Sequence, residues 1–537
     1  MKKTLLFCLL AGYSVSFAQT SLVFVFFKDK PNKAAFYANP LSELSQKSLN
    51  RRTSLGIALN DQDAPIEQSY IQAVQNLGFT VTDYSKWLNG VAVNATPAQI
   101  TTLQSQTYVQ SVESFARNSS VVPKFKNINK WENPTDNSTN KTLTVFDYGS
   151  GMEQIDQINL RPLHLAGYTG TGVTIAVIDT GFPMVDTGSA FARLWTNNHI
   201  KGGYDFVTKS STNIYNTTLN NHGSAILGSI GGYIQDTFVG SAPDADFYLY
   251  RSENAAVEIP EEELYWIEAA EEADRKGVDM ITTSLGYATF DDPKYNYTYA
   301  NLNGTTSFIA RGAEIAVNKG IFTLFAAGNS GAQTWHYLLT PADNAKVFTI
   351  GAVDSAGASS NFSSYGPNSV GVVKPDASAR GTLATSVYNN STISVTGTSI
   401  ATPIAAGGVA CLIQAFYTMN RDLMRTKLRE TASLFPNHTD QMGFGILNFG
   451  KFFNNVLSTS ELVKKNNIAI FPNPVKNILN IASESEVLSL EVYDNLGRLI
   501  IKANNQKSVK VEDFAKGVYY LKIQTKDKMY YEKFIKE

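Results

Sequence analysis

The stretch Gly167-Tyr-Thr-Gly-Thr-Gly-Val-Thr-Ile-Ala-Val-Ile-Asp-Thr-Gly181 decides which fold the chain can adopt. Its centre, Val173–Ile178, is an apolar run bounded by glycines, which is typical of a strand buried on both faces. Asp179 closes this run just before a tight turn. A carboxylate in that position can be buried and still point into a cleft, although such an Asp often does no more than shape the turn.

Further apolar runs alternate with helical patterns over about residues 150 to 457. The other predicted strands are Phe247–Arg251, Met280–Ser284, Ile321–Ala327 and Val347–Val353. Helical patterns between them cover Glu261–Lys276 and Ser307–Lys319. This alternation predicts an α/β domain with a mostly parallel sheet and helices on both faces. Catalytic residues are then expected at the carboxyl ends of the strands.

The segments on either side of this domain have different patterns. Residues 19–116 combine short strands with helices, one of them around Ser42–Arg52, and predict a small α+β unit. Residues 117–149 are rich in Asn, Ser, Thr and Lys and predict an exposed linker. Residues 467–537 hold only short strands around turns, which predicts a small β-sandwich.

The amino terminus carries the pattern of an export signal. Met1 is followed by two lysines, a brief apolar run and small residues up to Ala18. We therefore expect residues 1–18 to be a secretory signal peptide that is removed. The apolar run is far shorter than the roughly 20 residues that span a bilayer, and no later run is long enough either, so we expect no transmembrane segment.

The composition argues against nucleic acid as a partner and against an intramolecular disulfide. The chain has 45 Lys and Arg against 47 Asp and Glu, so it lacks the basic field that binding to nucleic acid requires. It has two cysteines, and Cys8 leaves with the signal. Cys411 then stands alone, so no intramolecular disulfide is expected. Its apolar surroundings predict a small buried hydrophobe rather than a reactive thiol.

Hydrolysis of a peptide bond by a serine needs a base beside the hydroxyl, a buried carboxylate that orients the base, and donors for the oxyanion. Asp179 is the candidate carboxylate. Of the five histidines, His222 alone stands at the head of a helix of small residues, His-Gly-Ser-Ala-Ile-Leu-Gly-Ser-Ile-Gly-Gly. The glycine beside it allows another backbone segment to approach closely. A single histidine is, however, more often structural.

Ser399 lies at the start of a second small-residue helix, Gly-Thr-Ser-Ile-Ala-Thr-Pro-Ile-Ala-Ala-Gly-Gly. Pro403 falls in its first turn, where the missing N–H is not needed. Because this helix is apolar throughout, we expect it to be buried with its amino end in the cleft. That end favours negative charge, which suits an oxyanion next to the serine. A serine in this position can also be a plain helix cap.

Two further motifs follow predicted strands. Asn329, in Ala-Ala-Gly-Asn-Ser-Gly, could donate its side-chain amide to the oxyanion. Ser284-Leu285-Gly286 ends another strand, and its backbone edge could pair with an extended peptide.

Together and in this order, the stretches around Asp179, His222, Asn329 and Ser399 resemble the subtilisin family of serine proteases. The order Asp, His, Ser matches that family and differs from the chymotrypsin and α/β-hydrolase orders. The resemblance implies a three-layer α/β domain in which Asp179 orients His222, His222 is general base and acid, and Ser399 is the nucleophile. Asn329 would share the oxyanion hole with the Ser399 N–H. The peptide cleft would be lined by Ser284, Leu285, Gly286, Ala327 and Gly328.

The chain departs from the family pattern at a few positions. Ser224 stands where Thr is common, and Ile400 and Ile404 stand where Met and His are common. None of these is a triad position. The chemistry implied requires no cofactor, and no residue is assigned as a metal ligand. A structural calcium is left open, because residues 231–240, where relatives place a calcium loop, are hard to match. Residues 291–304 could hold a cation, but a solvated loop is the favoured interpretation.

Resemblances also cover both flanking units. The amino-terminal unit resembles the propeptides of such proteases, which template folding and block the cleft until they are removed. Residues 467–537 resemble the carboxyl-terminal sorting domain of the type IX secretion system, through Phe471-Pro-Asn-Pro474 and Gly517-Val-Tyr-Tyr-Leu521 among other motifs. These resemblances imply three partners: protein or peptide substrates, the chain's own propeptide and the type IX machinery. The protein would be secreted or held at the surface of a Gram-negative bacterium.

Four functions remain open at this point. A secreted serine endopeptidase fits all the motifs. A peptide ligase or cyclase could use the same triad, because an acyl-enzyme can pass to an amine. A decayed, non-enzymatic binding protein conflicts with the intact set of Asp, His, Ser and Asn. Dinucleotide binding at Gly170-Thr-Gly172 is disfavoured, because these glycines precede the strand instead of following it.

Overall fold

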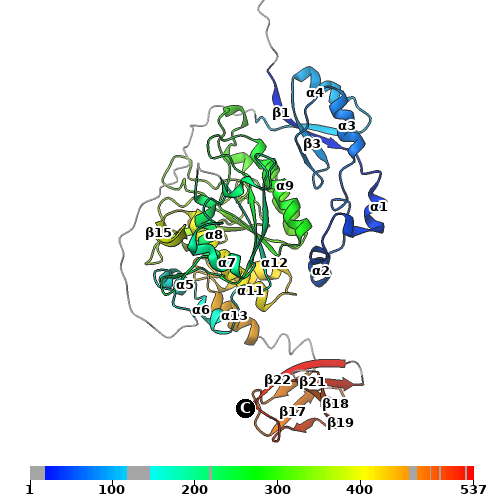
Figure 1. The fold of residues 1–537 in the computed structure, drawn as a ribbon, viewed down its shortest axis with the longest axis vertical. Coiled ribbons are helices and arrows are strands. Elements are labelled where there is room, and N and C mark those ends of the chain that lie inside the picture. Colours follow the sequence, from blue (N-terminus) through cyan, green and yellow to red (C-terminus); the bar gives the residue numbers. More distant parts are fainter. Residues whose placement is uncertain are drawn as a thin grey trace, which may run out of the picture. The chain divides into compact units, whose positions relative to one another are not determined.

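The computed structural model describes residues 19–117, 146–216, 220–458, 468–483, 485–494, 497–526 and 529–537 (Figure 1). The chain divides between Phe452 and Phe453 into two compact units. The signal predicted over residues 1–18 and most of the linker predicted over 117–149 lie outside the described residues.

Seven parallel strands form the central sheet of the larger unit, in the order β13-β12-β11-β10-β5-β9-β6. Their bounds are β5 (Thr174–Asp179), β6 (Ile200–Asp205), β9 (Asp246–Arg251), β10 (Met280–Thr283), β11 (Phe322–Ala326), β12 (Phe348–Val353) and β13 (Ala377–Arg380). The predicted parallel sheet is confirmed. The two edge strands, β6 and β13, were not predicted, because β6 contains Gly202-Gly203 and β13 is short and rich in Ala and Ser.

Two pairs of helices cover the sheet. Helix α9 (Glu261–Lys276) packs on α10 (Phe308–Asn318), and α8 (His222–Gly231) packs on α11 (Thr398–Ala415). Both α8 and α9 contact β5, and the two pairs lie on opposite faces of the sheet (Figure 1). Among the described helices, α11 is the one long and apolar enough to cross a membrane, but 83% of it is buried, as expected of a core helix.

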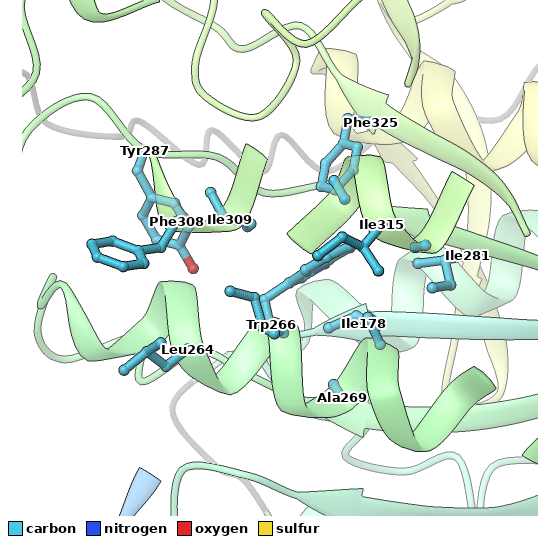
Figure 2. Packing of buried hydrophobic residues seen from close by; sticks show 14 of the residues in the cluster. Ile178, Leu264, Trp266, Ala269, Ile281, Tyr287, Phe308, Ile309, Ile315 and Phe325 are labelled. Atoms are coloured by element: carbon cyan, nitrogen blue, oxygen red, sulfur yellow. The ribbon is translucent and has the colours of Figure 1, made fainter. Parts of the chain in front are cut away.

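The core beneath α9 is organised around Trp266. Figure 2 shows its ring among side chains of the sheet and of α10, including Ile178, Ile281, Ile315 and Phe325. Its indole N–H donates to Thr283 Oγ1 at 2.9 Å, so the buried polar atom is satisfied. Three glutamates in the first turn of α9, two basic residues in its last turn and Gly277 (φ +81°) after it fix the helix bounds.

The amino-terminal part of this unit is a four-stranded antiparallel sheet in the order β2-β3-β1-β4. Its strands are β1 (Ser21–Phe27), β2 (Asp83–Ser85), β3 (Gly90–Ala95) and β4 (Val109–Ser114). Its helices are α1 (Lys33–Ala38), α2 (Gln46–Leu55), α3 (Gln68–Asn76) and α4 (Pro97–Gln104). The helix predicted around Ser42–Arg52 begins later, at Gln46, because Ser45 caps it through a bond from the Ser48 N–H.

This amino-terminal sheet docks on α9 and α10. The ring of Phe115 stacks on that of Phe308, with centroids 3.9 Å apart. The Glu271 carboxylate accepts hydrogen bonds from the backbone N–H groups of Lys86 and Trp87 at 3.2 and 3.0 Å, and from Ser85 Oγ. The side chain of Glu271 therefore caps the turn between β2 and β3.

A second set of buried charges joins α2 to the end of α9. Asp274 is fully buried and accepts from Arg51 at 2.5 Å and from Arg52 at 2.6 Å. Arg52 also pairs with Asp63 at 2.8 Å, and Asp63 pairs with Lys319 at 3.0 Å. Both arginines are buried away from water. Their positive charges are therefore stabilised by these carboxylates.

The smaller unit consists of two antiparallel sheets, β16-β17-β20 and β19-β18-β21-β22. The strands are β16 (Ile468–Phe471), β17 (Ile478–Ser483), β18 (Val487–Tyr493), β19 (Leu499–Asn504), β20 (Ser508–Lys510), β21 (Gly517–Thr525) and β22 (Met529–Lys536). Residues from both sheets, among them Leu479, Leu490 and Phe534, share one core. The sandwich predicted here is confirmed.

We expect Asp274→Ala to loosen the contact between α2 and α9. Removing one partner of a buried ion pair costs about 3–5 kcal/mol, so amide hydrogens of α2 should exchange faster by a factor of about 100 or more in the full chain. Hydrogen exchange followed by mass spectrometry measures this. The matched control is Glu272→Ala on the same helix, whose partly exposed pair with Arg275 contributes about 1 kcal/mol or less. Equal exchange in the two variants would contradict the prediction.

Docking of the amino-terminal sheet should depend on pH. The Glu268 carboxylate accepts from the Tyr84 N–H, and burial raises its pKa to about 7 although Lys209 lowers it. Undocking exposes Glu268 and returns its pKa toward about 4.3. Docking therefore takes up a proton and weakens as pH rises from about 5 through 7.

Hydrogen exchange of β2, corrected for the intrinsic effect of pH, checks this prediction. Protection should fall as pH rises, and Glu268→Gln should reduce the slope because Gln keeps an acceptor oxygen but does not titrate. A rise in protection toward pH 8 in the unaltered chain would contradict it.

Candidate active site

Asp179 and His222 meet at the carboxyl end of β5, an inner strand of the sheet. Asp179 is the last residue of β5 and is fully buried, and His222 is the first residue of α8. Asp179 Oδ1 lies 2.7 Å from His222 Nδ1. An ionised carboxylate can only accept, so Nδ1 carries the proton and Nε2 is the ring atom that can take another. Oδ1 also accepts from the Thr180 N–H at 2.8 Å, which fixes the carboxylate.

Gly223 permits this approach of α8 to β5. A Cβ atom at Gly223 would lie 2.3 Å from the Gly181 carbonyl oxygen and 3.1 Å from Asp179 Cβ. Any side chain at this position would therefore push the imidazole away from the carboxylate. The close backbone approach expected beside the histidine is confirmed.

Ser399 is placed at the cleft by the amino end of α11. The Ser284 hydroxyl donates to the Ser399 carbonyl oxygen at 2.8 Å and ties the turn after β10 to this helix. Ser399 Oγ and Asn329 Nδ2 lie 2.7 and 3.4 Å from one point, the position that a Cβ atom on Gly397 would take. Glycine at 397 thus leaves open the space that borders both the hydroxyl and the amide.

The Asn329 amide is oriented by Thr398. Asn329 Oδ1 accepts from the Thr398 N–H at 2.8 Å and from Thr398 Oγ1 at 3.0 Å. Thr398 Oγ1 in turn accepts from the Gly328 N–H at 3.1 Å. Because the oxygen is held in this way, the Nδ2 group is the end of the amide that remains to donate toward the serine.

A cleft of about 160 Å³ connects these groups. Of the residues predicted for the site, those that line the cleft are His222, Ser284, Leu285, Gly286, Gly328, Asn329 and Ser399. Asp179 lies behind His222 and does not reach the cleft. Ala327 is fully buried, with its carbonyl oxygen accepting from the Leu339 N–H, and Ala326 lines the cleft in its place.

Two other parts of the cleft wall were not predicted from the sequence. Leu339 follows no strand or helix pattern and reaches the cleft from a loop. Glu253 and Glu258 lie on the segment after β9 and also line the cleft. Tertiary contacts alone bring Leu339, Glu253 and Glu258 to the cleft, so no local sequence pattern indicates them.

Three carboxylates could bind a cation beside this wall. Oxygens of Glu253, Glu258 and Glu262 lie within 4.8 Å of one another. Burial raises the pKa of Glu262 to about 7, and burial together with the neighbouring Glu262 carboxylate raises the pKa of Glu253 well above its usual range. Glu262 accepts two backbone N–H groups, from Asn254 and Ile259, and Glu253 accepts from the Tyr287 hydroxyl. The carboxylates of Glu262 and Glu253 therefore already accept hydrogen bonds from within the protein.

Cys411 and residues 231–240 lie away from the cleft. Cys411 is buried in α11, and burial raises the pKa of its thiol, so it is the inert hydrophobe that was expected. Residues 231–240, the stretch considered for a calcium loop, contain a short hairpin of β7 (Tyr233–Ile234) and β8 (Phe238–Val239).

Three family profiles match successive parts of the chain. The profile of the subtilase family covers residues 170–448, just over half of the chain. A peptidase S8 propeptide domain of Bacteroidota matches residues 22–133, and a secretion system C-terminal sorting domain matches residues 469–537. The sorting domain makes this a secreted or cell-surface protein.

Characterised relatives match the same central region. The chain is 28% identical to subtilisin DY of Bacillus licheniformis over 288 residues, which is 53% of this chain and 91% of the relative. It is 30% identical to subtilisin of Bacillus pumilus and to subtilisin E of Bacillus subtilis over 297 residues, covering 55% of this chain and 95% and 69% of these relatives. The chain therefore belongs to the subtilase family of serine endopeptidases.

Proposed function

We propose that Asp179, His222 and Ser399 form the catalytic triad of a secreted endopeptidase that cleaves proteins through an acyl-enzyme. The observation that carries this proposal is the bond from His222 Nδ1 to Asp179 Oδ1, behind a cleft that His222 and Ser399 both line. The bond presents the base in the tautomer that can accept the serine proton.

The residues then act in sequence. His222 Nε2 takes the proton from Ser399 Oγ as this oxygen attacks the scissile carbonyl carbon, and Asp179 stabilises the imidazolium. The Asn329 Nδ2 group and the Ser399 N–H donate to the carbonyl oxygen, which becomes negative. Collapse of the tetrahedral intermediate transfers the proton from His222 to the leaving amine and leaves an ester on Ser399. Water, deprotonated by His222, hydrolyses this ester.

The substrate would lie along the turn after β10. An extended peptide can add as a strand to the edge formed by Ser284, Leu285 and Gly286, while Gly328 borders it from the turn after β11. Apart from the substrate and water, the chemistry uses only side chains and backbone N–H groups of this chain and requires no cofactor.

We further propose the division of the precursor into its parts. Residues 1–18 are the signal peptide, 19–116 an inhibitory propeptide, 117–149 the linker that is cut, 150–457 the peptidase and 467–537 the tail recognised by type IX secretion machinery. The contacts of Glu271 and Asp274 with the amino-terminal unit support the propeptide role, because they bind this unit to the peptidase surface.

Reaction with a fluorophosphonate tests the nucleophile. The mature enzyme should be labelled and should degrade casein, whereas Ser399→Ala should do neither. The masses of the peptide products distinguish hydrolysis from transfer of the acyl group to an amine. Labelling of Ser399→Ala at the level of the unaltered enzyme would refute the assignment.

Substitution of Asn329 tests the oxyanion hole. We expect Asn329→Ala to lower kcat by about 100- to 1000-fold with little change in KM, because the lost hydrogen bond forms only in the transition state. Steady-state kinetics with a peptide substrate measures both constants. A rise in KM at unchanged kcat would show instead that Asn329 only binds substrate.

A further inference from the structure

The space beside Ser399 is a slot between two turns. Strands β10 and β11 are neighbours in parallel register, with Thr283 opposite Phe325, so the turns that follow them run side by side. One turn contributes Gly286 and the other Gly328, and both glycines line the cleft. Since neither glycine has a side chain, the room in this slot depends on the side chains of other residues that enter it.

Leu339 fills the end of the slot. Its Cβ lies 2.8 Å from the position that a Cβ on Gly286 would take, and its Cγ lies 2.7 Å from the corresponding position on Gly328. The Leu339 side chain thus occupies the space that both glycines leave open. It is buried, and it packs behind the cleft on Ala288, Leu302 and Trp335.

The backbone on either side of Leu339 holds it in place. Its N–H donates to the Ala327 carbonyl oxygen at 3.1 Å. The next residue, Thr340, exchanges two hydrogen bonds with Tyr287, of 2.9 and 3.0 Å. The backbone of residues 339 and 340 is therefore bound to both turns of the slot, and it cannot move away from them without breaking these bonds.

From this geometry we propose that Leu339 restricts the substrate residue before the scissile bond to small side chains such as Ala, Ser or Gly. The inference rests on the proposed function. A carbonyl carbon at Ser399 Oγ with its oxygen toward Asn329 Nδ2 places the residue that carries it between the two turns. Its side chain then points into the slot between Gly286 and Gly328, which Leu339 shortens.

The test compares peptides that differ only at this residue. The enzyme is purified after expression of the full chain and loss of the propeptide, and kcat/KM is measured for a tetrapeptide anilide ending in Ala and for one ending in Phe. We expect at least a tenfold preference for Ala. Leu339→Ala should raise the Phe-to-Ala ratio of kcat/KM by tenfold or more, because it lengthens the slot.

Leu338→Ala is the matched control. Leu338 precedes Leu339 and is also buried, but it packs in the main core and does not line the cleft. The control should leave the ratio unchanged. If Leu339→Ala does not fold, the cleavage profile of the unaltered enzyme on a peptide library decides the question, because a majority of cuts after Phe, Tyr or Leu overturns the inference.

The outcomes separate this inference from the proposed function. A fluorophosphonate-labelled enzyme that cleaves after Phe as fast as after Ala overturns the role of Leu339 alone. An unchanged ratio in a folded Leu339→Ala enzyme does the same. An enzyme that is neither labelled nor active on any peptide overturns the triad assignment, and the inference fails with it.

Discussion

The hydrogen bond between Asp179 and His222 is the contact on which the site depends. It joins the last residue of β5 to the first residue of α8, and these two elements can meet at this distance only because residue 223 has no side chain. Burial of the carboxylate keeps water from competing for it. The cleft, the amide of Asn329 and the amino end of α11 are then arranged around an imidazole whose tautomer is already set.

The parallel sheet explains why groups so distant in sequence converge. The carboxyl ends of β5, β10 and β11 lie at the same edge, so Asp179, Ser284 and Asn329 arrive there from three separate strands. The face of α9 and α10 performs a different task. It buries the carboxylates of Glu271 and Asp274 under the propeptide. We therefore expect loss of the propeptide to expose both carboxylates to water.

Part of this arrangement follows directly from the sequence. Long apolar runs identified the inner strands, and small-residue helices with a polar residue at the head identified His222 and Ser399. Strands β6 and β13 were not predicted. They lie at the edges of the sheet, and they contain Gly, Ser and Ala in place of the long apolar runs of the inner strands. Leu339, Glu253 and Glu258 were not predicted as cleft residues. Their place in the cleft depends on which loops pack together, and no local sequence pattern indicates that.

A crystal structure of the mature enzyme treated with a peptide aldehyde tests the proposed triad most directly. We expect a covalent bond from Ser399 Oγ to the former aldehyde carbon, with its oxygen within hydrogen-bonding distance of Asn329 Nδ2 and with His222 still hydrogen-bonded to Asp179. An aldehyde bound elsewhere, or bound at Ser399 with His222 turned away from Asp179, would contradict it.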